Sequence, residues 1–290
     1  MKIVNYASVE NLYERFPDLR KQDVNELEQW VQSKAHLPPV TELELIQFIQ
    51  SNYYDLEAAK RTVEAFFTFR TSCKDFFHER DIMAVPVQRS MDVLSLVVLP
   101  GETPAGYRVL LAKIVDSDAA KFNLSTLLKL AFMCVDVALW EEGCAEGFQL
   151  VIDMDGLHLG HLPKLGIFTL RNFLNYIQEA LPIRLKGVHL INVVPFIDKI
   201  VAMIKPFMKK EILEIFQLHQ KEETVYPFVP RKMLPSEYGG EEPSRLVLTK
   251  QLFDKTMELR DFLLEKERLQ KVDESKRIKT RSLSNMFGLF

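Results

Sequence analysis

Two aspartates that follow an apolar strand carry the clearest catalytic signal in the sequence. Asp153 and Asp155 stand in LVIDMDGLH (150–158), where Gly156 can supply a turn. Two carboxylates in this pattern suit a Mg²⁺-dependent phosphatase, in which one attacks phosphorus and the other moves the proton. That chemistry also needs acids further along the chain, and the later aspartates are isolated in amphipathic contexts. We therefore expect Asp153 and Asp155 to cap a loop at the strand end, with the phosphatase as the enzymatic alternative.

Other reactive residue types do not form a site by their spacing. GETPAG (101–106) resembles a phosphate loop, but a strand-like segment follows it, so we expect a hairpin turn. His158 and His161 would need further ligands to hold a metal, and we expect a polar loop there. No metal, cofactor or catalytic residue is predicted. Three cysteines without a CxxC pair favour a reducing, cytoplasmic environment over a disulfide framework, and these are Cys73, Cys134 and Cys144.

The composition is that of a chain with a sizeable core. Of the 290 residues, 47% are hydrophobic, and the formal net charge of -3 predicts no general affinity for nucleic acid. The first residues lack the apolar run of a signal peptide, and no segment approaches about 18 consecutive apolar residues. We expect a cytoplasmic monomer whose contact with membranes is transient and peripheral.

The first third of the chain has helical patterns. Asp23 with Glu26, and Thr41 with Glu44, have the spacing of capping boxes ahead of apolar residues at helical intervals. These stripes predict a small helical bundle over residues 1–85.

The pattern changes after about residue 90, where strand-like and helical segments alternate. Such an order predicts an α/β domain with a largely parallel sheet. An amphipathic helix at 245–270 and a basic tail, KRIKTRSLSNMFGLF (276–290), follow. The expected strands are 93–99, 107–115, 147–154 and 186–192, and the expected helices are 123–142, 163–181, 195–204 and 206–219.

Three ordered blocks make the second half resemble the CRAL-TRIO family of lipid-binding proteins. They are VIDMDGLHLGHL (151–162), LPIRLKGVHLINVVPFIDKIVAMIKPFM (181–208) and LPSEYGGEEPS (234–244). FIQSNYYDLEAAKR (48–61) is similar to a helix of the family's N-terminal bundle. The resemblance covers about residues 20–245.

The resemblance implies three regions. An N-terminal helical bundle would occupy 1–85, and a CRAL-TRIO domain would occupy 86–242. That domain would hold a mostly parallel five-stranded sheet, which floors a lipid cavity under a gate helix at 196–208. A C-terminal helix and the basic tail would occupy 243–290.

On the family's pattern, fourteen residues would wall the cavity, although each could equally fill a solid core. They are Leu127, Leu130, Cys134, Phe148, Leu150, Ile152, Phe173, Tyr176, Ile177, Leu185, Val188, Ile197, Val201 and Ile204.

The resemblance also implies contact with anionic membranes. Lysines flank the apolar gate, and this pattern suits such contact. Arg61, Arg184 and Lys186 stand at positions that bind phosphoinositide headgroups in the family, and Lys209 and Lys210 could add to them. Other positions of that basic patch are replaced here, by Asn52, Glu211 and Ile215.

The sequence thus predicts a non-enzymatic carrier for a hydrophobic small molecule or lipid, of tocopherol, retinoid or phospholipid type. A module that senses lipid without transferring it is the second alternative.

Overall fold

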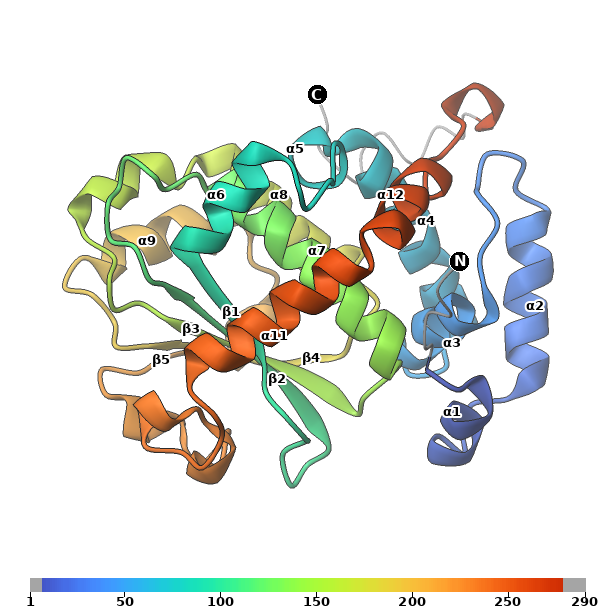
Figure 1. Ribbon diagram of the computed structural model, residues 1–290. Coiled ribbons are helices and arrows are strands. Elements are labelled where there is room, and N and C mark those ends of the chain that lie inside the picture. The colour runs from blue at the N-terminus through green and yellow to red at the C-terminus, as the bar shows by residue number, and fades with distance from the viewer. Residues whose placement is uncertain (1–6, 279–290) are drawn as a thin grey trace.

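The computed structural model describes residues 7–278, so most of the predicted basic tail lies outside the described part. Most helices of the first third pack together on one side of the molecule, around a core rich in phenylalanine, whereas the last of them, Val85–Val93, packs against later elements (Figure 1). One hydrophobic cluster continues from this bundle into later helices, so it does not mark where one domain ends and the next begins. The domain boundaries at residues 85 and 242 therefore stay predictions. The helices of this region are α1 (Val9–Arg15), α2 (Lys21–Gln32), α3 (Glu42–Ser51), α4 (Leu56–Ser72), α5 (Lys74–Phe77) and α6 (Val85–Val93).

One of the two expected capping boxes is present. The Thr41 hydroxyl accepts a bond from the Glu44 backbone N–H, and the Glu44 carboxylate accepts one from the Thr41 N–H, which fixes the start of α3. The box at Asp23 was predicted wrongly. Helix α2 already begins at Lys21, so Asp23 lies in its first turn and pairs with the Arg20 guanidinium at 2.8 Å.

A five-stranded sheet forms the centre of the second part, as predicted. Its strand order is β1-β2-β3-β4-β5, with β1 and β2 antiparallel across the GETPAG hairpin and the remaining neighbours parallel. The crossovers between parallel strands are helical, which makes the fold α/β. The strands are β1 (Leu94–Val98), β2 (Tyr107–Ile114), β3 (Gly147–Asp153), β4 (Leu185–Ile191) and β5 (Phe216–Leu218).

The end of the predicted helix 206–219 is instead strand β5. Helix α10 stops at Ile215, and the next three residues pair with the free edge of β4, with Phe216 beside Val188. Pairing at this edge gives hydrogen bonds to backbone N–H and C=O groups of β4 that would otherwise be unpaired.

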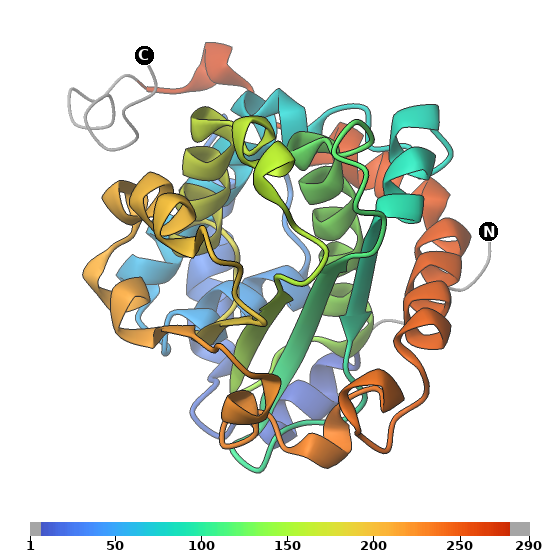
Figure 2. The same cartoon turned by 90° about the vertical axis from the view of Figure 1, so that its left-hand side faces the viewer.

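The two faces of the sheet are covered differently. One face packs against loops between residues 222 and 238 in a compact apolar cluster. Helices that follow β2, β3 and β4 cover the other face (Figure 2). These helices are α7 (Leu124–Glu142), α8 (Ile167–Glu179), α9 (Ile197–Ile204) and α10 (Lys210–Ile215). Short 3₁₀ helices complete the connections, namely η1 (Leu159–Lys164), η2 (Lys205–Phe207), η3 (Glu222–Val225), η4 (Arg231–Met233) and η5 (Ser236–Tyr238).

The predicted helix at 245–270 is two helices. Helix α11 (Arg245–Glu258) runs along β1 and α7 (Figures 1 and 2), and α12 (Arg260–Leu269) continues to the bundle. Lys266 of α12 pairs with Glu44 of α3 at 2.8 Å, and a last turn, η6 (Glu274–Lys276), follows. The C-terminal helices therefore connect the sheet to the bundle.

A buried ion cluster joins the same regions. Asp136 of α7 accepts bonds from Arg70 of α4 at 2.5 Å and from Arg80 at 2.7 Å. Arg70 also reaches the hydroxyl of Tyr176 at 3.2 Å and the side chain of Gln270 at 3.0 Å. Burial raises the pKa of Asp136, but the two guanidinium ions outweigh it, so the pKa lies below its usual value.

Within residues 7–278 no helix combines the length and the apolar run that crossing a membrane requires.

Candidate ligand-binding cavity

A cavity of about 320 Å³ lies between the sheet and the helices that cover it. Apolar side chains form almost all of its wall, from β1 to β4 on one side and from α7 and α8 on the other. Its volume lies at the lower end of the range found for small-molecule sites.

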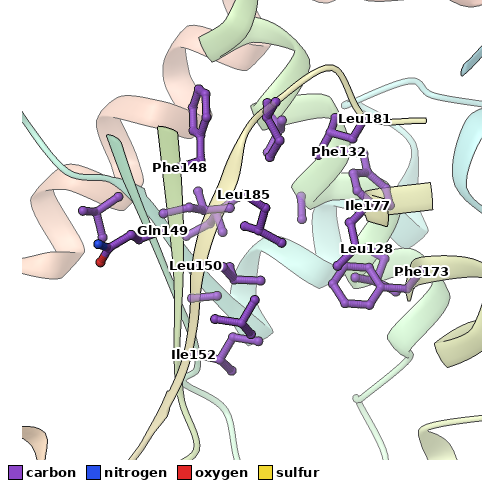
Figure 3. Close-up of a pocket in the computed structure, with 18 of the residues that line it drawn as sticks. Leu128, Phe132, Phe148, Gln149, Leu150, Ile152, Phe173, Ile177, Leu181 and Leu185 are labelled. Carbon is purple, nitrogen blue, oxygen red and sulfur yellow. The ribbon is translucent and has the colours of Figure 1, made fainter. Parts of the chain in front are cut away.

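Strand β3 shows most directly that this side of the sheet is hollow. Side chains alternate between the two faces of a strand. Gln149 and Val151, on one face, are buried, whereas Phe148, Leu150 and Ile152, on the other, are only partly buried although β3 is the middle strand. Figure 3 shows these three pointing toward α7 and α8, and Gln149 pointing away.

Helices α7 and α8 supply the opposite wall. The Asn123 side chain caps α7 by accepting a bond from the Thr126 backbone N–H at 3.1 Å. Apolar residues three and four apart in each helix then share one face. Those that reach the cavity include Leu127, Leu128 and Phe132 of α7 and Phe173 and Ile177 of α8, and Leu181, just after α8, joins them (Figure 3).

The predicted gate is helix α9 followed by the 3₁₀ turn η2. Ile200 and Ile204 are buried and line the cavity, whereas Asp198 and Lys199 are exposed. Helix α9 ends ahead of Pro206, which cannot continue the helical hydrogen bonds. The segment thus closes one side of the cavity with a single apolar face.

Nine of the fourteen predicted wall residues line the cavity in the structure, which does not test whether they contact a ligand. They are Leu127, Phe148, Leu150, Ile152, Phe173, Ile177, Leu185, Val188 and Ile204.

The other five do not line it. Leu130 and Cys134 are buried in the core beside it, where the Cys134 sulfur contacts Thr256 of α11. Tyr176 is buried among the bundle phenylalanines and bonds to Arg70. Ile197 and Val201 are partly buried on α9, on the same helical face as Ile200 and Ile204, and Ile197 packs against the core beside the cavity. Their contact with a ligand stays a prediction.

Sequence reasoning missed the contribution of β1 and β2. In β2 the cavity-facing residues alternate with the buried Val109 and Leu111, whereas in β1 residues on both faces are buried. The missed residues include Leu94, Leu96, Val98, Leu110, Ala112 and Ile114, together with a polar end formed by Arg15, Glu102, Arg108 and Glu142.

Asp153 lies at the opposite end of the strands and is fully hydrogen-bonded. Its carboxylate accepts bonds from Lys113 at 2.7 Å, Tyr238 at 2.8 Å, Asn192 at 3.0 Å and the Asp155 backbone N–H at 3.0 Å. Only 2% of Asp153 is exposed. The carboxylate therefore fastens strand ends and the later Tyr238 turn together, and it presents no free oxygen for attack on a phosphate. Residues 7–278 contain no group of three His, Cys, Asp or Glu side chains placed to hold a metal.

The predicted basic residues do not form one open patch. The Arg184 guanidinium is buried, donates to the Gln50 carbonyl at 2.7 Å and lies over the ring of Tyr53 at 4.3 Å. Lys186 donates to the Tyr53 hydroxyl at 2.7 Å, and Arg61 is exposed on α4. The remaining two lysines pair with acids near α10, Lys209 with Glu179 and Lys210 with Glu214.

Comparison with known proteins agrees with this architecture. Residues 94–240 match the CRAL/TRIO domain family, and residues 16–86 match the Pinta-like UBA domain. The chain is 27% identical over 239 residues to alpha-tocopherol transfer protein-like of Homo sapiens, covering 80% of this chain and 68% of that protein. It is 22% identical over 231 residues to clavesin-1 of Mus musculus, covering 78% and 65%. The crystal structure of Sfh5 superposes with a TM-score of 0.53 and 12% identity, covering 87% and 92%, which supports the fold alone.

The fold and the cavity define an α/β protein with an internal apolar chamber covered by helices. The family match spans more than half of the 290 residues, and the chain therefore belongs to the CRAL/TRIO family. Members of this family bind lipids and other hydrophobic small molecules.

Proposed function

We propose that this protein is a carrier that encloses one hydrophobic small molecule or lipid and exchanges it with membranes. The observation that carries the proposal is the row of partly buried apolar side chains on the middle strand, Phe148, Leu150 and Ile152, facing a cavity of about 320 Å³. Similarity to alpha-tocopherol transfer protein-like supports cargo of this chemical type.

The energetics of apolar burial explain why such a carrier needs a gate. Each buried methylene contributes roughly 0.8 kcal/mol, so a sixteen-carbon chain gains on the order of 10 kcal/mol before association costs. A bilayer offers the same gain. Transfer therefore requires a segment that opens at the membrane, where lipid can replace the contacts it loses.

Helix α9 suits that role. Its residues Ile200 and Ile204 close the cavity, while Val201 and Met203 are only partly buried and Lys199 is exposed. An apolar helix with flanking lysines favours the boundary of an anionic membrane. We infer transient membrane association through this helix.

The carrier proposal is tested by filling the cavity. Ile152→Trp adds a large ring to the cavity face, and we expect the amount of lipid that mass spectrometry finds in the natively purified protein to fall at least tenfold, an order of magnitude consistent with overpacking a core-like site. Leu246→Trp is the matched control, because Leu246 is 72% exposed. Lipid-free wild-type protein that also fails to load any hydrophobic compound would contradict the proposal. Vesicle-to-vesicle transfer kinetics separate a carrier from a lipid-sensing module.

Phosphoinositide binding is a further part of this proposal, supported by the position of Lys186 beside Tyr53 and by the exposure of Arg61. Arg61→Glu with Lys186→Glu should weaken binding to phosphoinositide liposomes by at least roughly thirtyfold, because the two surface cations near an anionic membrane contribute about 1 kcal/mol each. Arg184 is unsuitable for this test, since its buried guanidinium holds the Gln50 carbonyl. Lys250→Glu, at an exposed lysine of α11, is the control. Equal binding by all variants would remove phosphoinositides from the proposal.

A further inference from the structure

One end of the cavity is polar, unlike the rest of its wall. It lies where the parallel strands begin, at the opposite edge of the sheet from Asp153. Two ion pairs line it. Arg15 at the end of α1 pairs with Glu102 of the β1–β2 hairpin at 2.6 Å, and Arg108 of β2 pairs with Glu142 at the end of α7.

The strand register places Arg108 on the cavity face of the sheet. Arg108 is the Cα partner of Phe148, and Leu110 is the partner of Leu150. Side chains of neighbouring partners point to the same face, and Phe148 and Leu150 line the cavity. The register thus places the charged side chain of Arg108 on the cavity face. Lys113 and Asp153 also border the cavity, but they pair with each other on the opposite face of the sheet.

The Arg108–Glu142 pair is incompletely satisfied. The Arg108 Nε–H is buried, and no acceptor for it lies within residues 7–278. A buried donor without an acceptor is costly, so a ligand oxygen that reached it would gain a charge-assisted bond. Glu142 is partly exposed and has carboxylate lone pairs that can accept a bond from a ligand O–H.

We propose that this polar end is the head-group site of the cavity and takes the hydroxyl of a hydrophobic alcohol. This inference rests on the proposed carrier function. A hydroxyl can accept from the Arg108 guanidinium and donate to the Glu142 carboxylate at once. The two arginines and two carboxylates at this end balance in charge, so a neutral head group keeps the balance, whereas a fatty-acid carboxylate would add an uncompensated negative charge.

The test compares ligands that differ only in the head group. Lipid-stripped full-length protein is equilibrated with neutral phosphatidylcholine vesicles that contain 1-hexadecanol, hexadecane or palmitate. The protein-bound fraction is then measured by mass spectrometry. For the wild type we expect uptake of the alcohol and the hydrocarbon, with palmitate taken up least.

The deciding variant is Arg108→Met with Glu142→Leu, because removing both partners leaves no unpaired charge. We expect its hexadecanol-to-hexadecane uptake ratio to fall by about tenfold relative to the wild type, the loss of roughly one charge-assisted hydrogen bond. Glu142→Gln should lower the ratio by a smaller factor. Lys250→Met with Asp254→Leu, on the exposed side of α11, is the matched control and should not change it.

The possible failures are distinct. An unchanged ratio in both Glu142 variants, with hexadecane still taken up, overturns the head-group site and leaves the carrier function standing. Wild-type preference for palmitate overturns the alcohol class. If no compound enters the wild type, the carrier function itself fails. Should the double variant not fold, Glu142→Gln alone decides, since it keeps the side-chain volume.

Discussion

His189 and His219 form a buried pair whose protons can be assigned from their partners. The Thr224 hydroxyl donates to the Lys221 carbonyl, so it must accept from Nδ1–H of His219 at 2.8 Å. Nε2 of His219 is then the acceptor for Nδ1–H of His189 at 3.0 Å. His219 is therefore neutral. Burial lowers the pKa of His189 to about 4, so near neutral pH its Nε2 is a buried lone pair without a partner in the described chain.

This pair predicts a loss of stability in mild acid. Burial, followed by the nearby His219, lowers the pKa of His189 from 6.5 to about 4. Between these values the unfolded chain binds a proton that the folded chain does not, so the free energy of unfolding falls as the pH drops from about 6.5 toward 4. The loss is on the order of 3 kcal/mol. Urea unfolding measured at several pH values should show it.

His189→Gln keeps a hydrogen-bonding side chain but does not titrate. We expect a flatter dependence of the unfolding free energy on pH for this variant across the same window. Equal slopes for variant and wild type would contradict the assignment of the acid sensitivity to this residue.

At the scale of elements, the contact between bundle and sheet depends on helix α7. Its Asp136 is the shared counterion of Arg70 and Arg80, and the two arginines are 4% and 1% exposed. Replacing one member of a buried ion cluster leaves the other charges buried without a counterion. This lowers the free energy of unfolding more than replacing the whole cluster with apolar residues would.

Asp136→Asn is therefore expected to lower the free energy of unfolding by about 3 to 5 kcal/mol, because two buried guanidinium ions lose their only carboxylate within the described residues. Chemical denaturation measures this loss. Asp254→Asn, an exposed carboxylate on α11, is the control and should change stability by less than about 0.5 kcal/mol. A loss below about 1 kcal/mol for the buried variant would mean that solvent or a rearrangement compensates the arginines.

Local patterns predicted most elements, and tertiary pairing decided the rest. The nearly continuous apolar run in residues 147–154 predicted β3, and the capping box predicted the start of α3. Strand β5 was missed because its three residues continue a helical pattern, and only the open edge of β4 makes them a strand. The break between α11 and α12 at Leu259 has no glycine or proline to indicate it.

The same distinction applies to the candidate site. The family pattern predicted Phe148, Leu150 and Ile152 as wall residues, and all three line the cavity. Tyr176 follows the same apolar spacing as its neighbours on α8, but its side chain packs in the bundle. Contacts between α8 and α4 decide which side of α8 faces the bundle, and the sequence spacing does not show them. Arg108 was missed because a charged residue near a strand start is usually solvent-exposed, and only the sheet register turns it toward the cavity.

At the scale of the whole molecule, one side of the sheet is solid and the other is hollow. Creating cavity volume in a core costs roughly 24 cal/mol per Å³, so about 320 Å³ corresponds to on the order of 8 kcal/mol. That is comparable to the entire stability of a typical domain. A bound hydrophobic molecule that restores the missing contacts therefore stabilises the fold and not only itself.

The hollow side of the sheet also governs how the protein responds to compression. Unfolding under hydrostatic pressure is driven by the internal space that the folded chain gives up when water enters. The ligand-free protein should accordingly denature at lower pressure than a ligand-bound form, and the difference between the two transition pressures reports how completely a bound molecule fills the cavity.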